Sequence, residues 1–299
     1  MRQRALGALG SLVLVVGLLL IPNAAGAGDN RPPPADFDGE GDTDIAVFRP
    51  AQGLWLVHGG GTHLGTRDDR TVPGDYDGDG DTEFAVYRPE GGYWFVEGAP
   101  PVQWGGPDPC GTAYDLGISR CDVPVPADYD GDAKTDLAVY RRWSGVWLVR
   151  NGPTVQWGAF YDVPVPADYD GDGDDDIAVF RMDGGYWFVH DGPTVPFGIR
   201  GDVPVPGDYD GDGDDDIAVF RPSTGVWHIR RGPSVQFGTS DDIPVPGDYD
   251  GDGDTDIAVY RRTIGVWFVH GGPTVAWGTE DDVSVVLPDS IGQAFYFFP

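Results

Sequence analysis

The chain has 299 residues and a formal net charge of −30, from 49 acidic and 19 basic side chains. So acidic a chain is repelled by nucleic acid and by anionic membrane surfaces, and we expect neither as a partner. Residues 28–299 suffice for one large hydrophobic core, and we expect a single domain that is a monomer.

The first 27 residues have the pattern of a secretory signal peptide. Arg2 and Arg4 precede an apolar run from Leu12 to Ile21, and the small residues Ala25-Gly26-Ala27 follow it. An uncleaved membrane anchor is the alternative, but the run is short for a bilayer span of about 20 residues. We therefore expect a secreted, extracellular protein without membrane insertion.

A nine-residue acidic loop recurs six times after this segment. Its regular form, Asp248-Tyr-Asp-Gly-Asp-Gly-Asp-Thr-Asp256, places carboxylates at alternate positions with glycines between them. The copies begin near residues 36, 75, 128, 168, 208 and 248, so the last four are 40 residues apart and the second unit carries an insertion. Six units of this length predict a propeller or a solenoid.

Carboxylates packed this closely repel one another unless a cation lies between them. Oxygen ligands in this number suit Ca²⁺, which takes about six to eight. The loop is not an EF-hand, because a strand follows it directly and no Glu closes it at a twelfth position. Asp/Gly turns without metal are the alternative. We expect several structural calcium ions.

The fifth unit illustrates the strands of each repeat. Val203-Pro-Val-Pro206 is short and extended, and Ile217-Ala-Val-Phe220 is an apolar run typical of a strand buried on both faces. Val226-Trp-His-Ile229 and Val235-Gln-Phe-Gly238 add two strands after turns. Four short strands per unit predict an all-β propeller of six blades, with residues 283–299 as a partial seventh at the closure. An open β-solenoid is the alternative.

The two cysteines, Cys110 and Cys121, both lie in the insertion of the second unit. In an exported protein we expect them to form a disulfide bond. Such a bond closes a loop of about ten residues and stabilises the fold by about 2–3 kcal/mol.

The acidic loop and the apolar strand after it resemble the FG-GAP or VCBS repeat family, to which the integrin α-subunit propellers belong. The Phe-Gly pair of that family stands at Phe197-Gly198 and Phe237-Gly238, with Trp-Gly in other units. The resemblance covers residues 36–278 and implies a calcium-binding propeller. It implies side-chain ligands at loop positions one, three, five and nine, and a backbone carbonyl at position seven. The implied metal ligands, loop by loop, are Asp36, Asp38, Glu40, Asp42 and Asp44; Asp75, Asp77, Asp79, Asp81 and Glu83; Asp128, Asp130, Asp132, Lys134 and Asp136; Asp168, Asp170, Asp172, Asp174 and Asp176; Asp208, Asp210, Asp212, Asp214 and Asp216; and Asp248, Asp250, Asp252, Asp254 and Asp256.

Three of the loops depart from this pattern. The third has Ala133 in place of the sixth-position glycine and Lys134 at the seventh position. We expect Ala133 to adopt a left-handed conformation, at a cost of about 1 kcal/mol, and Lys134 to oppose calcium beside it. Glu40 and Glu83 bring longer side chains into the first and second loops. The third site should therefore be the weakest.

Two other residue types recur once in every unit. A tryptophan at one strand position indicates packing between blades rather than six sugar platforms. An arginine after the apolar strand indicates a bidentate ion pair with a repeat carboxylate such as Asp202 or Asp242. Trp143 lies outside the pattern, in a turn, and is a candidate ligand contact. The recurring residues are Trp55, Trp94, Trp147, Trp187, Trp227 and Trp267, and Arg49, Arg88, Arg141, Arg181, Arg221 and Arg261.

Catalysis finds little support in the sequence. There is no nucleophile elbow, no HExxH motif and no phosphate-binding glycine loop, and the five histidines do not cluster. We therefore expect a non-catalytic binding or adhesion module for an extracellular glycan or protein. The alternative is a propeller enzyme acting on polysaccharide as a hydrolase or lyase, whose paired carboxylates would come from distant blades.

Overall fold

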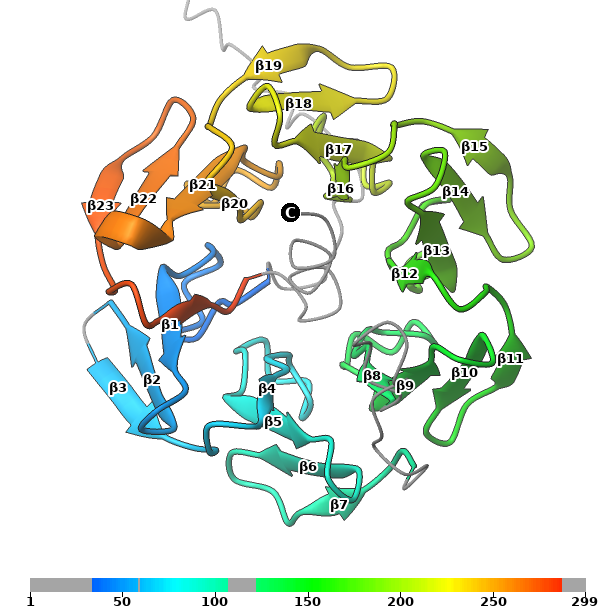
Figure 1. Ribbon diagram of the computed structural model, residues 1–299. Helices are drawn as coiled ribbons and strands as arrows, with labels where there is room; N and C mark the ends of the chain where they lie inside the picture. Colours follow the sequence, from blue (N-terminus) through cyan, green and yellow to red (C-terminus); the bar gives the residue numbers. More distant parts are fainter. Residues whose placement is uncertain (1–33, 59, 107–121, 287–299) are drawn as a thin grey trace, which may run out of the picture.

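Six four-stranded antiparallel sheets form a closed ring around a central axis (Figure 1). The computed structural model describes residues 34–58, 60–106 and 122–286. Within each sheet the strands follow one another from the axis to the periphery. The predicted six-bladed propeller is thus confirmed, and the open solenoid is wrong.

The strands are short, from two to four residues each, as expected for the closely spaced turns of the sequence. Blade 1 contains β24 (Val283–Ser284), β1 (Ala46–Arg49), β2 (Leu54–Val57) and β3 (Gly60–His63); blade 2 contains β4 (Arg70–Thr71), β5 (Ala85–Arg88), β6 (Tyr93–Val96) and β7 (Val102–Gln103); blade 3 contains β8 (Val123–Pro124), β9 (Ala138–Arg141), β10 (Val146–Val149) and β11 (Thr154–Gln156). Blade 4 contains β12 (Asp162–Pro164), β13 (Ala178–Arg181), β14 (Tyr186–Val189) and β15 (Thr194–Pro196); blade 5 contains β16 (Val203–Pro204), β17 (Ala218–Arg221), β18 (Val226–Ile229) and β19 (Ser234–Gln236); blade 6 contains β20 (Ile243–Pro244), β21 (Ala258–Arg261), β22 (Val266–Val269) and β23 (Thr274–Ala276).

The two ends of the described chain meet in blade 1. β24 is the innermost strand of this blade and pairs with β1, so that Val47 lies opposite Ser284 and Phe48 opposite Val283. The segment that we expected to begin a partial seventh blade therefore completes the first, and that part of the prediction is wrong. The physical reason is that β1 would otherwise expose an unpaired edge, since the described residues before the first acidic loop form no strand.

The apolar core follows from the burial of the second and third strands of each blade. In β17, Ala218, Val219 and Phe220 are completely buried, as a strand covered on both faces requires. In β18 only alternate residues are buried, and Trp227 is one of them. Its ring centroid lies 5.4 Å from that of Phe220, in a cluster that spans blades 4 to 6.

The recurring tryptophans pack as predicted. All six are at most 1% exposed, and each indole Nε1 donates to a backbone carbonyl of the fourth-strand segment at 2.9–3.0 Å. The indole N–H is thus paired, as burial of a polar group demands. These rings serve the core and cannot act as sugar platforms.

The recurring arginines form the expected ion pairs. In blade 5, Arg221 donates through Nε and Nη2 to the two oxygens of Asp202, both at 2.8 Å. Asp202 is 1% exposed and also accepts the backbone N–H of Ile199. The same bidentate pair recurs in the other blades, and its members are Arg49–Asp282, Arg88–Asp69, Arg141–Asp122, Arg181–Asp162 and Arg261–Asp242.

Helix is almost absent from the part of the chain that the structure describes. One 3-10 turn, η1 (Arg262–Ile264), precedes β22, and no helix in these residues is long and apolar enough to cross a membrane. The predicted signal peptide, the Cys110–Cys121 disulfide and residues 287–299 of the tail lie outside the described residues.

Candidate metal sites in the acidic loops

Each acidic loop connects the innermost strand of a blade to its second strand. The fifth loop, residues 208–216, for example, lies between β16 and β17. In blade 1 the first loop precedes β1, because the inner strand comes from the other end of the chain. Residues of all six loops line an axial cavity of about 800 Å³. The ring therefore gathers the six loops around its axis.

The first carboxylate of each loop organises the backbone around itself. In the fifth loop, Asp208 Oδ1 accepts the N–H of Gly211 at 2.7 Å, and Oδ2 accepts that of Gly213 at 2.9 Å. Both glycines have left-handed φ angles, 69° and 93°, which residues with a Cβ rarely adopt. The corresponding bonds recur in the other five loops. These bonds curl the chain so that its later carboxylates turn back toward the first.

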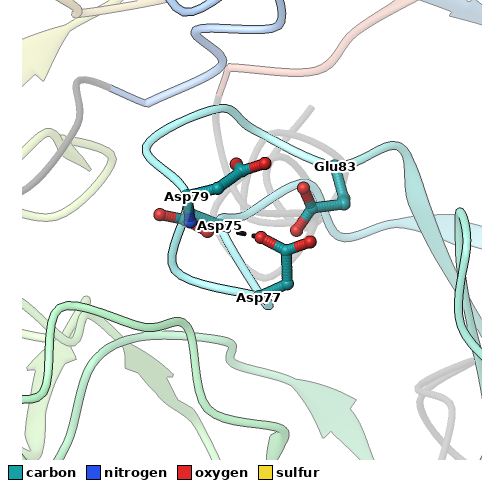
Figure 2. A group of neighbouring side chains, drawn as sticks. All are labelled: Asp75, Asp77, Asp79 and Glu83. Atoms are coloured by element: carbon teal, nitrogen blue, oxygen red, sulfur yellow. Dashed lines mark hydrogen bonds between the residues drawn. The ribbon is translucent and has the colours of Figure 1, made fainter.

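The carboxylates at positions one, three and nine converge. In the second loop, Asp75, Asp77, Asp79 and Glu83 point toward one another (Figure 2), and one oxygen of each lies within 4.8 Å of the others. The same limit holds for one oxygen each at positions one, three and nine of four further loops: Asp36, Asp38 and Asp44; Asp128, Asp130 and Asp136; Asp168, Asp170 and Asp176; and Asp208, Asp210 and Asp216.

The sixth loop has the same hydrogen bonds around its first and ninth residues. Tyr249 N–H donates to Asp256 Oδ2 at 3.0 Å, as the second residue of every other loop does to its ninth. Asp248, Asp250 and Asp256 thus occupy equivalent places in an equivalent loop.

The fifth-position residue joins the convergent oxygens in the second loop, through Asp79. The fifth-position residue also supports the local backbone, since Asp79 Oδ1 accepts the N–H of Asp81 at 3.1 Å. Asp212 Oδ1 accepts the N–H of Asp214 at 3.1 Å, and Asp132, Asp172 and Asp252 do the same for the seventh residue of their loops. Glu40 is not part of the first group of oxygens. The fifth-position carboxylates of the first, third, fourth and fifth loops are not among the convergent oxygens, and the full ligand set that the resemblance implies stays a prediction.

The negatively charged carboxylates within each loop repel one another. Burial, together with the charges of the other carboxylates in the loop, raises the pKa of Asp136, Asp176 and Asp216 to about 6, although each accepts a backbone N–H that opposes the rise. A cation placed among the oxygens removes this penalty. An all-oxygen donor set of carboxylates fits a hard divalent ion better than a soft one.

The six loops also bind one another in a closed circle. The N–H of the eighth residue donates to the carbonyl of the first residue in the preceding loop, at 2.5–2.6 Å in all six cases. The circle includes the bond from Thr43 to Asp248, which joins the first loop to the last. The sequence interpretation missed this role. The recurrence of Thr or Asp at the eighth position was the signal that could have indicated it: Thr43, Thr82, Thr135, Asp175, Asp215 and Thr255.

The seventh-position side chain likewise reaches the preceding loop. Burial raises the pKa of Asp214, and so do the charges of Asp212 in its own loop and of Asp168 and Asp170 in the loop before. Lys134, at the seventh position of the third loop, also extends to the preceding loop, since its ammonium donates to the carbonyl of Asp77. The charge that we expected beside the third site therefore lies against the second.

Two other predictions about individual residues can be compared with the structure. Ala133 has a φ of 62°, so the expected left-handed conformation is confirmed. Trp143 lies between β9 and β10 and is 49% exposed, an accessible position for the proposed ligand contact, which stays a prediction.

Solved structures share this fold at low sequence identity. A lectin from Agrocybe aegerita, described with the structural basis of its specific recognition of non-reducing terminal N-acetylglucosamine, aligns with 86% of this chain and 79% of its own at a TM-score of 0.51 and 16% identity. BBS1N in complex with ARL6DN aligns with 83% of this chain and 81% of its own at a TM-score of 0.45 and 15% identity. At its identity the likeness to the lectin shows the propeller fold alone. No protein-family model and no curated protein sequence matches the chain.

Proposed function

We propose that the protein is a secreted propeller of the FG-GAP/VCBS type that holds structural calcium in its acidic loops and binds an extracellular glycan or protein without catalysis. The observation that carries the proposal is the convergence of three or four carboxylates in loop after loop, next to the bonds that join neighbouring blades. Repetition on this scale suits a scaffold better than a single reaction centre, which needs unlike residues in one place.

Within each loop the residues have distinct roles. The first Asp holds the curl by accepting two N–H groups, and its remaining lone pairs, with the third and ninth carboxylates, would hold the ion. Calcium would supply the positive charge that balances these carboxylates. The backbone N–H of the eighth residue bonds its loop to the preceding one, so a loop ordered by the ion would restrain its neighbour.

The nature of the ligand is supported by the fold comparison. The Agrocybe aegerita lectin, with which this chain shares its fold, recognises a terminal sugar. A glycan is therefore the first ligand class to test, and a protein partner is the second.

Binding to a glycan array in calcium and in chelator, beside an assay for polysaccharide degradation, tests the proposal. We expect glycan binding that the chelator weakens, and no degradation products. Degradation of a polysaccharide would contradict the non-catalytic assignment. If no glycan binds, the ligand in this proposal is a protein. Crosslinking to extracellular proteins then tests for that ligand.

A further inference from the structure

A surface pocket of about 440 Å³ lies between blades 4 and 5. Phe197 of blade 4 faces Arg221, His228, Arg231 and Ser234 of blade 5 across it. The volume is within the range of about 300–1,000 Å³ that is typical of small-molecule sites. No Asp or Glu lines this pocket in the described structure, although the chain carries 49 of them.

The pocket exists because three side chains here are smaller or more polar than at the neighbouring interface. Between blades 3 and 4, Trp157 donates its indole N–H to the carbonyl of Phe188 and packs edge-on against His190. Between blades 4 and 5, Phe197 stands in the place of that Trp, and His228 stands in the place of Phe188. Ser234, opposite His228, likewise replaces the Thr that pairs with Phe188.

His228, which lines the pocket, carries a buried polar atom without a partner in the described structure. Its Nδ1 lies 2.9 Å from Ser234 Oγ, while Nε2 is buried and has no hydrogen-bond partner among the described residues. Burial and the nearby charge of Arg221 lower the pKa of His228, so the ring is neutral near pH 7. With the Ser234 hydroxyl donating to Nδ1, Nε2–H is left to donate to a ligand.

Two guanidinium groups lie at the pocket, and the charge of Arg221 is balanced by Asp202 while that of Arg231 is not. Arg221 uses Nε and Nη2 for Asp202, which leaves Nη1 without a partner in the described structure. Arg231 is exposed and has no ion pair or hydrogen bond to any described side chain. Its φ of 67° is left-handed, a strained conformation for an arginine, where blades 2 and 6 have Gly98 and Gly271. Asn151 and Asp191 are left-handed at the same place in blades 3 and 4, so the turn requires this conformation.

We propose that this pocket binds the anionic group of an acidic sugar. The carboxylate or sulfate lies among Arg231, Arg221 Nη1 and His228 Nε2, and the sugar ring lies against Phe197. Guanidinium groups are the preferred donors for such planar or tetrahedral anions. The inference rests on the proposed function as a glycan-binding module, and it names the site and the ligand class.

The test measures the binding of glucuronate, glucose 6-sulfate and glucose to the full chain by calorimetry or NMR titration. We expect at least one of the acidic sugars to bind about tenfold more tightly than glucose, since charge-assisted hydrogen bonds are the stronger ones. The carboxylate and sulfate probes distinguish the two sources of the anion. Binding of glucose as tight as that of both acids would overturn the proposal.

Three variants locate the site, each built with the residue that another blade has at the same place. They are Arg231→Gly, His228→Phe and Phe197→Trp, of which the last fills the pocket. Each should weaken acidic-sugar binding about fivefold or more, as loss of a charged or buried contact does. Asn151 occupies the equivalent position in blade 3, away from the pocket. The control variant Asn151→Gly should therefore leave binding unchanged.

The outcomes separate this inference from the proposed function. If the wild-type chain binds glycans on an array but the three variants bind acidic sugars normally, the pocket is not the site and the binding module survives. If neither acidic sugar binds, the inference fails whatever the array shows. Melting curves confirm that each variant is folded, and Arg231→Asn, with the residue of blade 3, replaces Arg231→Gly if that variant is not.

Discussion

Arg49 and Asp282 form a bidentate ion pair between opposite ends of the described chain, with Nε–Oδ1 at 2.7 Å and Nη2–Oδ2 at 2.8 Å. The equivalent pairs in the other five blades join residues 19 apart, whereas this one spans 233. Asp282 is completely buried and also accepts the N–H of Thr279. The arginine–aspartate pair is thus a local contact in five blades, whereas in blade 1 it joins the two ends of the ring.

Removal of residues 283–299 should severely destabilise the propeller. The deletion takes away β24, so β1 loses its inner partner, and it removes the buried Val285 and Val286 from the core. Each buried valine contributes roughly 1.5–3 kcal/mol, and typical total stability is about 5–15 kcal/mol. We expect thermal unfolding well below that of the full chain, or none that is cooperative. Full-length Val285→Asp should behave similarly, and an unchanged melting temperature for both would show that the tail does not close the ring.

Asp282→Asn should cost roughly 2 kcal/mol of stability at pH 7, because it leaves Arg49 without its carboxylate. Burial acts to raise the pKa of Asp282, but the hydrogen bonds from Arg49 and Thr279 outweigh it and the pKa is lowered. Because the pKa of Asp282 is lower in the folded protein than in the unfolded chain, the ion pair stabilises the fold at pH values above the unfolded-state pKa. This stabilisation is lost as the pH falls through the folded-state pKa. The difference between wild type and variant should therefore shrink below about pH 4. Asp281→Asn at the exposed neighbour is the control, and a difference that grows in acid would contradict the prediction.

Calcium should raise the melting temperature strongly, and a chelator should lower it. Binding to the folded ring alone adds RT ln(1 + [L]/Kd) per site, about 2.7 kcal/mol when calcium is a hundredfold above Kd. Magnesium should not substitute, since it requires closer octahedral geometry. Differential scanning calorimetry in calcium, in chelator and in chelator with excess magnesium measures this. Identical curves in calcium and chelator would mean that the loops hold no ion.

Ala133→Gly should stabilise the protein, and Gly173→Ala should destabilise it, each by about 1 kcal/mol. Both residues occupy the sixth place of their loops with left-handed φ angles of 62° and 97°. A Cβ at Gly173 would meet no atom within 4 Å, so the cost arises from the backbone conformation and not from a clash. Urea unfolding in excess chelator isolates this contribution from metal binding. A loss of stability in Ala133→Gly would refute the assignment.

Lys134→Ala should strengthen calcium binding at the second loop and not at the third. The reason is that its ammonium contacts Asp77, where its positive charge opposes a divalent cation. Calcium titration of the melting temperature should therefore show a larger effect in Lys134→Ala than in wild type.

Two ligand variants identify which loop responds to Lys134. Glu83→Gln impairs the second group of carboxylates and Asp136→Asn the third. We expect the gain from Lys134→Ala to vanish in the Glu83→Gln background and to persist with Asp136→Asn. The reverse pattern would restore the original expectation that Lys134 weakens its own site.

Features encoded within one repeat unit were predictable from sequence. The curl of Asp208 around Gly211 and Gly213 depends on neighbours in the chain, and only glycine adopts the required φ angles readily. The left-handed conformation of Ala133 follows from its place in the same pattern. The Arg221–Asp202 pair was recognisable because both members recur at fixed positions in every unit.

Features between blades depended on the tertiary structure. Whether Val283–Ser284 begins a seventh blade or completes the first is decided by ring closure, since the unpaired edge of β1 is satisfied only by a strand from the far end of the chain. The direction of Lys134 and the circle of bonds through Thr43 likewise depend on how neighbouring loops meet.

The sequence by itself determined the repeat, its four strands, the buried tryptophans and the acidic loops, because turn chemistry and the alternation of buried residues act over short distances along the chain. Only the tertiary structure decided how the ring closes, the partner of each seventh and eighth loop residue, and the pocket that Phe197 and His228 share. Phe197 and His228 are 31 positions apart in the sequence, and their pairing follows from the packing of one blade against the next. Such contacts depend on the angle between sheets and on the closure of the ring, and no local pattern of residues encodes either.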